Sequence, residues 1–231
     1  MGTSHNPKIV TDGLVLNLDA GNRKSYPTTG TVWRDLTKNK YLSNLISGPT
    51  FTSSNGGAIN LSGILAQYLT VNGGMPSGIS TGFTFECWVR VTDLASRRAI
   101  IQADGNIDIG LEIVVETTGA VKCSEYEYKN ATYQICITAS GAVAVGAWTH
   151  ITVSRTTGNL YTIYINGVSK ATGTRAFIIQ PTTRIGYIDG DLTPLALSFK
   201  GDMSIIRNYN RTLTSTEVYN NFVANRARFG Y

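Results

Sequence analysis

Two glutamates, Glu112 and Glu116, have the spacing that comes nearest to a catalytic pair. Alternate residues of a β-strand share one face, so both carboxylates would lie on the same side of a strand over 110–116. Paired carboxyl groups carry out glycoside hydrolysis when their environments push their pKa values apart. Val114 stands between them on that face and supplies no charge that could tune either group. We therefore expect a strand whose polar face lies in water, and no catalytic residues.

The two histidines, His5 and His150, lie far apart in the sequence. Neither is accompanied by a serine-centred nucleophile motif or by another ligand at metal-binding spacing. This pattern argues against hydrolase triads and zinc sites. We expect His150, on a strand that begins at Trp148, to be an outward polar residue or a hydrogen-bonded residue of the core.

Three cysteines, Cys87, Cys123 and Cys136, make an odd count that is unusual for a disulfide-built secreted domain, so free thiols are the first expectation. A two-residue turn at 129–130 would place Cys123 opposite Cys136 at a non-hydrogen-bonded site, where side chains come closest. A disulfide between them is the alternative, although a reducing cytoplasm opposes it. Cys87 would remain a small buried apolar side chain.

Twelve tyrosines are numerous for 231 residues. Several fall on predicted strands, where they would form an aromatic face suited to sugar stacking or to a protein interface. The alternative is that they fill half-buried strand positions. These tyrosines are Tyr126, Tyr128, Tyr133, Tyr161 and Tyr164.

The net charge of +5 comes from 20 basic and 15 acidic side chains, and no run of lysines or arginines concentrates it. Arg207, Arg211, Arg226 and Arg228 come nearest to a basic patch, and we interpret them as a solvated helix face. Hydrophobic residues make up 42% of the chain, which indicates a folded protein, and no apolar stretch reaches the length of a membrane helix. We expect neither nucleic acid binding nor membrane insertion.

Short runs of β-branched and aromatic residues recur between clusters of Gly, Asn, Asp and Ser, which is the pattern of an antiparallel β-sandwich. Within 83–91 the apolar residues alternate, but Trp88 falls on the opposite face, so this strand should bury side chains on both sides. The runs predict strands at 14–18, 83–91, 99–103, 110–116, 120–128, 131–137, 148–155, 160–165, 183–188 and 204–208.

One hairpin and one helix are predicted from local motifs. The pair Asn166-Gly167 favours the positive φ angles of a two-residue hairpin. Thr214 and Glu217 have capping-box spacing, and the apolar stripe after them predicts a short C-terminal helix that packs against the sandwich edge. The domain boundaries that follow are an N-terminal arm at 1–13 and a single domain over 14–231.

Three stretches carry motifs in a fixed order: a strand at 82–89, a Trp-led strand and tyrosine-rich hairpin at 147–167, and a last strand with its capped helix at 199–217. Together they resemble the laminin-G-like branch of the concanavalin A-like lectin and glucanase superfamily. The resemblance covers most of the chain from Gly13 to Phe229. It implies an all-β fold, a two-sheet antiparallel jelly-roll sandwich with one short C-terminal helix.

The opening motif, 13–20 followed by 33–37, resembles laminin-G-like structural proteins of tailed-bacteriophage virions. The polar N-terminus shows no export signal. The resemblance implies a capsid-decoration, tail or fibre subunit that is assembled in the host cytoplasm and becomes part of the virion. Such a subunit would contact other virion proteins and occur in multiple copies.

The resemblance also implies two kinds of site. Superfamily members that cleave glucans use a strand of the form Glu-x-Asp-x-Glu, and here Val114 replaces its middle carboxylate, which counts against hydrolysis. Laminin-G-like domains often hold calcium at a sandwich rim, but no full calcium-loop pattern is present, and 189–191 reads equally as a turn. We expect no cofactor, with calcium as the alternative. Its available ligands are Asp104, Asp108, Asp189, Asp191 and Asp202.

We predict a non-enzymatic structural protein of a bacteriophage virion that acts through protein-protein contacts. The alternative is a carbohydrate-binding or host-attachment lectin module that binds cell-surface glycans. The two functions overlap if an exposed particle protein also adheres to sugars. A more distant alternative is a glucan hydrolase that uses Glu112 or Glu116.

Overall fold

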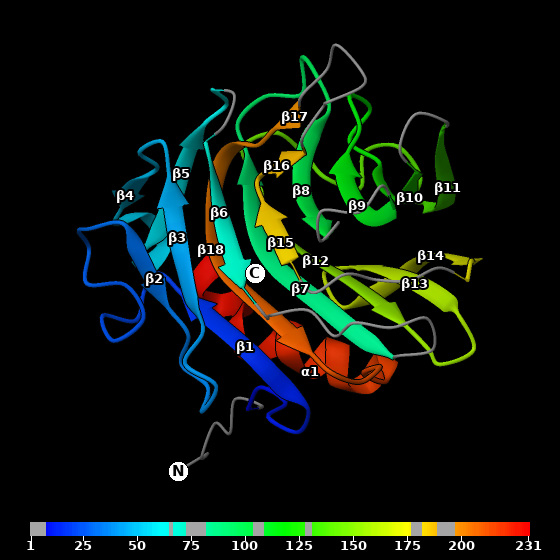
Figure 1. Ribbon diagram of the computed structural model, residues 1–231, viewed down its shortest axis with the longest axis horizontal. Helices are drawn as coiled ribbons and strands as arrows, with labels where there is room; N and C mark the ends of the chain where they lie inside the picture. The colour runs from blue at the N-terminus through cyan, green and yellow to red at the C-terminus, as the bar shows by residue number, and fades with distance from the viewer. Residues whose placement is uncertain are drawn as a thin grey trace.

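The computed structural model of this chain consists of two large antiparallel β-sheets that face each other, with one α-helix on the outside (Figure 1). It describes residues 8–64, 67–72, 82–103, 109–127, 131–176, 182–188 and 197–231. The predicted fold class is confirmed: an all-β, two-sheet antiparallel sandwich with a short C-terminal helix. Among the described residues, no helix is long and apolar enough to cross a membrane.

The back sheet, which carries the helix on its outer side, has the order β14-β13-β12-β7-β18-β5-β4. Strand β1 pairs with the C-terminal half of β18, beside β5 on the same edge of that strand. The bounds are β1 Leu14–Asp19, β4 Thr50–Thr52, β5 Ala58–Ser62, β7 Phe83–Val91, β12 Trp148–Arg155, β13 Leu160–Ile165, β14 Val168–Thr174 and β18 Lys200–Tyr209.

The front sheet has the order β11-β10-β9-β8-β15-β6-β3-β2, and a small pair, β16-β17, lies beside β8. The bounds are β2 Val32–Arg34, β3 Leu42–Ile46, β6 Tyr68–Asn72, β8 Arg98–Ala103, β9 Ile109–Val115, β10 Val121–Glu127, β11 Ala131–Ile137, β15 Thr182–Ile185, β16 Tyr187–Ile188 and β17 Leu197–Ser198. The helix α1 spans Ser215–Arg226, and two short 3₁₀ turns, η1 and η2, span Ser54–Gly56 and Ala227–Phe229.

Every predicted strand corresponds to a strand of the structure, within a few residues at the ends. The predicted strand at 183–188 is divided into β15 and β16, because Gly186 adopts a positive φ of 84° between them. The hairpin at Asn166-Gly167 is confirmed, with φ values of 52° and 78°. Strands β2 to β6 were not predicted, because they are short and interrupted by turn residues.

Strand β7 shows how the sandwich buries both of its faces. Phe83, Phe85 and Cys87 point into the core between the sheets, where most large apolar side chains gather. Trp88 points outward, yet it is also fully buried. Its ring stacks on Phe229 with 4.1 Å between the ring centroids. The two-sided burial predicted from the position of Trp88 is therefore confirmed, and the structures on its outer side are α1 and η2.

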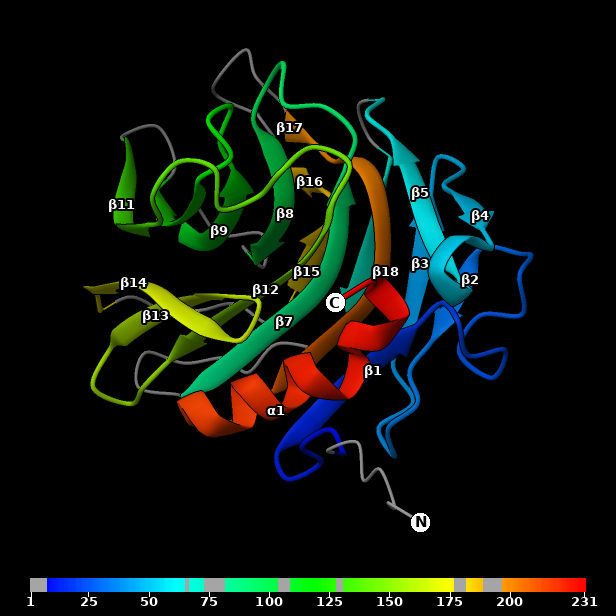
Figure 2. The same ribbon diagram turned by 180° about the vertical axis from the view of Figure 1, so that it is seen from behind.

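The prediction that the helix packs against the sandwich edge is wrong. Seen from behind, α1 crosses the outer face of the back sheet near its central strands (Figure 2). Phe222 of α1 stacks on Trp88 at 5.7 Å between ring centroids, and the ring of Trp88 also lies against His150. The helix packs on the central strands because their outward residues form an apolar patch that only a second layer can bury.

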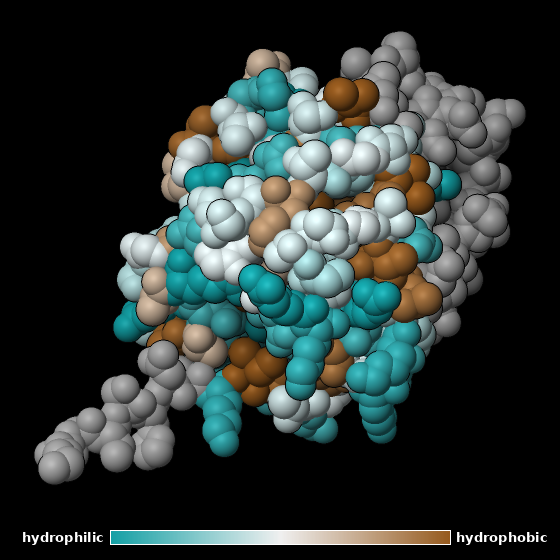
Figure 3. Space-filling model, turned by 90° about the vertical axis from the view of Figure 1, so that its left-hand side faces the viewer, coloured by the Kyte–Doolittle hydropathy of each residue, from teal (hydrophilic) through white to brown (hydrophobic). Residues whose placement is uncertain are grey.

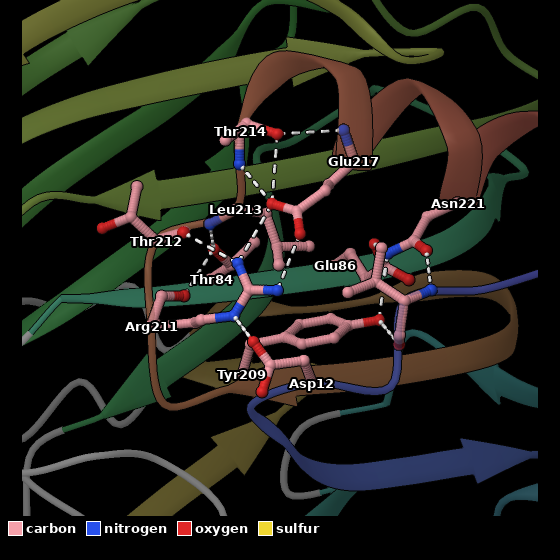
Figure 4. A network of polar contacts seen from close by, with 11 residues as sticks. Asp12, Thr84, Glu86, Tyr209, Arg211, Thr212, Leu213, Thr214, Glu217 and Asn221 are labelled. Carbon is pink, nitrogen blue, oxygen red and sulfur yellow. Dashed lines mark hydrogen bonds and ion pairs between the residues drawn. The ribbon is translucent and has the colours of Figure 1, made fainter.

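The capping box at the start of α1 is confirmed (Figure 4). The Thr214 hydroxyl accepts a hydrogen bond from the Glu217 amide, and the Glu217 carboxylate accepts one from the Thr214 amide. Arg211 donates to both oxygens of the same carboxylate, at 3.0 and 2.7 Å. The Arg211 guanidinium thereby lowers the pKa of Glu217 to about 2.

A buried polar cluster lies beside the aromatic stack under α1. Glu86 accepts hydrogen bonds from Arg207 Nη1 at 2.7 Å and from Asn221 Nδ2 at 2.9 Å. His150 Nε2 lies 3.6 Å from the same carboxylate. Burial alone would raise the pKa of Glu86, but His150 and Arg207 outweigh that effect and lower it to about 2. The cluster connects β7, β12 and β18 to the helix.

Part of the predicted N-terminal arm packs on this cluster. The Val10 amide donates to Asn221 Oδ1 at 2.8 Å, and the Tyr209 hydroxyl donates to the Val10 carbonyl at 3.1 Å. Val10 also packs against apolar side chains that surround Val218. The described residues of the arm are therefore held by α1 and β18.

Acid should weaken the fold through Glu86 and Glu217. Both carboxyl groups have a pKa near 2 in the folded chain, against an ordinary value of 4.5. Because the folded-state value is the lower one, their contribution is complete above about pH 4.5 and is lost as the pH falls toward 2. Urea unfolding at a series of pH values should show the free energy of unfolding declining through that window. A constant value between pH 5 and 2.5 would contradict this assignment.

Candidate functional site

A row of polar side chains crosses the outer face of the front sheet, which is the face turned away from the core. On each strand the neighbours of these residues, such as Leu45, Leu69 and Ile185, point inward. The strand register places the outward residues side by side. From β3 to β11 the row is Asn44, Thr70, Arg184, Gln102, Glu112, Ser124 and Gln134.

Only part of this row is accessible. Gln102, Glu112 and Ser124 are buried even though they point away from the core. Asn44 and Thr70, on β3 and β6, are half-buried and reachable from solvent. We define the open half as the outer face formed by β2, β3, β6 and β15. Its polar groups are the amide of Asn44, the hydroxyl of Thr70 and the guanidinium of Arg184, which donates to Gln102 Oε1 at 3.3 Å.

Two tyrosines adjoin the row on the same face. The rings of Tyr68 on β6 and Tyr187 on β16 stack with 5.3 Å between centroids and 19° between planes. Both side chains are half-buried, so each ring keeps accessible surface. A half-exposed ring beside amide, hydroxyl and guanidinium groups offers both an apolar platform and directional hydrogen bonds.

The structure separates the two glutamates that were considered as a catalytic pair. Glu112 is only 5% exposed, so the expectation that its face lies in water is wrong. Val114 packs in a small apolar cluster with Ile188 and Leu197, which cover this part of the sheet. Glu116 lies beyond the end of β9 and pairs with Lys122 Nζ at 2.9 Å. An apolar cluster therefore stands between the two carboxylates.

The predicted aromatic face is not formed by the tyrosines that the structure describes. Tyr161 points into the core, Tyr164 packs in the cluster near α1, and Tyr133 is exposed with the Arg175 guanidinium 4.5 Å from its ring centroid. Tyr128 and the side chain of Tyr126 lie outside the described residues. The pair that does stack, Tyr68 and Tyr187, was not singled out, because the partners come from strands far apart in sequence.

The four arginines near the C-terminus were expected to form a solvated helix face, and this prediction is wrong. Arg207 is buried against Glu86, Arg211 pairs with Glu217, and Arg228 pairs with Asp19 at 2.7 Å. Arg226, at the end of α1, is exposed. Three of the four guanidiniums thus join elements of the fold.

The two cysteines of the predicted hairpin do face each other. Cys123 pairs with Cys136 in the register of β10 and β11, with a β-bulge directly after Cys123. The predicted turn at 129–130 lies outside the described residues. Both thiols are free, as is that of the buried Cys87, and burial raises the pKa of the Cys123 thiol.

Of the aspartates considered for calcium, the structure describes Asp202 alone. Its carboxylate is buried, pairs with Arg90 at 2.6 Å and accepts a hydrogen bond from Asn60 Nδ2 at 2.8 Å. A cation ligand would have to break this pairing. In the part of the chain that the structure describes, no three His, Cys, Asp or Glu side chains gather to hold a metal. The other candidates, Asp104, Asp108, Asp189 and Asp191, lie outside it.

A family model described as "Concanavalin A-like lectin/glucanases superfamily" and named Laminin_G_3 matches residues 61–219, which is more than half of the chain. The chain belongs to this superfamily. The resemblance inferred from the ordered motifs is thereby confirmed. No curated protein sequence matches this member of the superfamily.

Solved structures share the superfamily fold at low sequence identity. Domain 4 of AbnA, a GH43 extracellular arabinanase from Geobacillus stearothermophilus solved in complex with arabinotriose, has a TM-score of 0.69 and 17% identity. The match covers 90% of this chain and 97% of that domain. The binding domain of botulinum neurotoxin DC, in complex with SialylT, has a TM-score of 0.67 and 13% identity over 93% of this chain.

The receptor binding domain of botulinum neurotoxin type G matches with a TM-score of 0.67 and 16% identity over 92% of this chain. This superfamily member spans about half the length of the neurotoxin binding domains, 51% for type G and 52% for DC. At these identities the likeness establishes the fold alone. Any shared ligand has to be argued from the side chains of this chain.

Proposed function

We propose that the chain is a carbohydrate-binding domain that holds an oligosaccharide on the open half of the front sheet. The observation that carries this proposal is the Tyr68–Tyr187 ring pair beside the accessible Asn44, Thr70 and Arg184. Sugars present apolar C–H faces and a rim of hydroxyl groups. An aromatic platform flanked by planar polar groups matches both features.

The solved neighbours support this proposal. The arabinanase domain was solved with arabinotriose and one neurotoxin binding domain with SialylT. Both share the sandwich fold described above. The match covers 97% of the arabinanase domain, so a domain with this fold has been solved with a bound oligosaccharide.

We also propose that binding occurs without cleavage. Glycoside hydrolysis needs two carboxyl groups that flank one glycosidic bond. Glu112 is buried, Glu116 is paired with Lys122, and Val114 lies in an apolar cluster between them. This arrangement leaves no pair of carboxylates around a shared space on β9.

Replacing Tyr68 with Ala should weaken oligosaccharide binding roughly tenfold, because a lost aromatic platform removes about 1–1.5 kcal/mol. A glycan array that includes arabinotriose would first identify ligands of the unmodified chain, and calorimetry would then compare variants. Tyr219→Ala is the matched control, because Tyr219 is an exposed tyrosine on α1, on the other side of the sandwich. The same incubations should release no shorter oligosaccharides.

Three results would contradict the proposed function. The first is an array on which the chain binds no glycan at high protein concentration. The second is equal weakening by Tyr68→Ala and Tyr219→Ala, which would place the site elsewhere. The third, release of sugar from a bound glycan, would overturn the non-catalytic part of the proposal.

The resemblance of the opening motif to virion proteins suggests where the domain acts. We propose that the domain is displayed on a bacteriophage particle, where many copies would convert weak sugar contacts into firm attachment. In the structure, Asp35 of this motif accepts hydrogen bonds from the amides of Asn17 and Thr37, each at 2.9 Å, which joins the motif to β1. Mass spectrometry of purified particles would detect the chain if this setting is right.

A further inference from the structure

One segment of the chain holds most of its net charge. Between 21 and 42 there are five basic residues and one acidic residue, a net of +4 within a chain of +5. The single acidic residue is Asp35. Because no more than two of these cations are adjacent, they do not look like a basic patch in the sequence. The five are Arg23, Lys24, Arg34, Lys38 and Lys40.

The carboxylate of Asp35 is turned inward. Asp35 is only 3% exposed, and besides the two amides already named its carboxylate accepts hydrogen bonds from the Thr37 hydroxyl at 2.6 Å and the Tyr41 amide at 3.3 Å. It forms no ion pair with a residue that the structure describes. Asp35 therefore holds the loop that leads into β3, and it neutralises none of the surrounding cations through an ion pair.

Three of these cations line one cleft. Lys24, Arg34 and Lys40 surround a hollow of about 530 Å³ together with Asp35, Leu36 and Leu42. All three cations are exposed, and none pairs with a carboxylate in the described part of the chain. Figure 3 faces this edge of the molecule and shows hydrophilic side chains projecting from its lower half beside apolar patches.

The cleft is continuous with the open half of the front sheet. Arg34 pairs with Leu42 in the register of β2 and β3, and Asn44 lies two residues further along β3 on the same face. Neighbouring strands lie about 4.8 Å apart, so Arg34 and Arg184 are separated by roughly three strand spacings. An oligosaccharide that lies across the strands would therefore reach from the polar row into the cleft.

We propose that this cleft binds the carboxylates of an acidic polysaccharide, one that contains uronic acid units. The proposal rests on the proposed carbohydrate-binding function and names the ligand class. Arg34 offers a planar fork that matches a carboxylate, and Lys24 and Lys40 add compact positive charges. Leu42, which is 55% exposed, supplies apolar surface for the C–H face of a sugar ring.

Single-stranded nucleic acid fits the cleft less well. Proteins that bind it combine positive charge with aromatic rings on which bases stack. The described residues that line the cleft include two leucines and no aromatic side chain. The adjoining row offers uncharged amide and hydroxyl groups, which suit sugar hydroxyls better than phosphates.

The test compares a size-defined oligogalacturonide with the same oligosaccharide after methyl esterification of its carboxyl groups. The unmodified chain should bind the free acid, and esterification should weaken binding roughly tenfold, because three solvent-exposed charge contacts are individually weak but add. The triple variant Lys24→Gln, Arg34→Gln, Lys40→Gln should bind the free acid more weakly by the same factor. Added salt should weaken binding of the free acid and leave binding of the ester unchanged. The charge-matched control replaces with Gln three cations elsewhere that form no ion pair with a described residue, Arg97, Lys170 and Arg226.

Each contrary outcome has a distinct meaning. Equal binding of acid and ester, or equal loss in the control variant, would overturn the cleft as a carboxylate site. A single-stranded DNA that binds more tightly through the same three cations would reassign the cleft to nucleic acid. If the oligogalacturonide fails to bind while array glycans still bind through Tyr68, this inference falls and the proposed function stands. If no sugar of any kind binds, both fall.

Discussion

Replacing Glu86 with Gln should destabilise the fold by about 3–5 kcal/mol, the usual cost of removing one partner of a buried ion pair. The variant keeps the shape of the side chain but removes its charge. Arg207, buried beside it, would then lose the one carboxylate that it pairs with among the described residues. Its other acceptors there, Asn17 and Asn225, are neutral amides at 3.1 Å. Urea unfolding followed by tryptophan fluorescence would measure the loss.

Two further variants show whether the charge is the cause. Glu116→Gln removes a carboxylate that is 20% exposed and whose partner, Lys122, is 14% exposed, so the Lys122 charge keeps access to water and the variant should cost less than Glu86→Gln. The double variant Glu86→Gln, Arg207→Met should recover part of the stability, because no unpaired charge remains buried. A loss below about 1 kcal/mol in Glu86→Gln alone would mean that this ion pair contributes little.

Replacing Trp88 with Ala should cost a similar amount, about 3–5 kcal/mol, because it leaves a cavity under the helix. Trp88 is fully buried and lies between the back sheet and the rings of Phe222 and Phe229. Without the indole, α1 and η2 lose the centre of their contact with the sheet. The global unfolding free energy and the hydrogen exchange of α1 amides should therefore change together.

The matched variant Trp88→Phe keeps an aromatic ring at the same place and should cost less than about 1.5–2 kcal/mol. Thr216→Ala, at an exposed position in the first turn of α1, serves as the surface control. If Trp88→Ala leaves the exchange of α1 amides unchanged, the helix is not held by this stack. The polar cluster around Glu86 would then be the contact that holds the helix on the sheet.

Much of the fold could be predicted because strands with alternating apolar residues report which face is buried. The odd position of Trp88 correctly indicated a second buried face, and the capping box of Thr214 and Glu217 correctly marked the helix start. The place where the helix docks could not be predicted, since it depends on which outward residues lie together across β7, β12 and β18. That information arises only from the strand register.

The candidate site was largely hidden for the same reason. Tyr68 and Tyr187 are separated by more than a hundred residues and meet because β15 pairs with β6. Three of the four arginines that looked most like a basic patch form internal ion pairs. Lys24, Arg34 and Lys40, in contrast, gather only where the chain folds back at β2 and β3. Which cations form ion pairs depends on the fold. The sequence alone therefore pointed to the wrong residues as the accessible basic cluster.

The position of β18 bears on how the chain is made. This strand inserts between β7 on one side and β5 and β1 on the other, and the amide of Val10 bonds to a side chain 211 positions later. Such distant contacts form slowly, because long loops must close first. During synthesis on the ribosome, β1, β5 and β7 emerge long before β18 and expose unpaired edges that invite aggregation or chaperone binding. Slow translation at low temperature is therefore the condition under which this chain should be produced most cleanly.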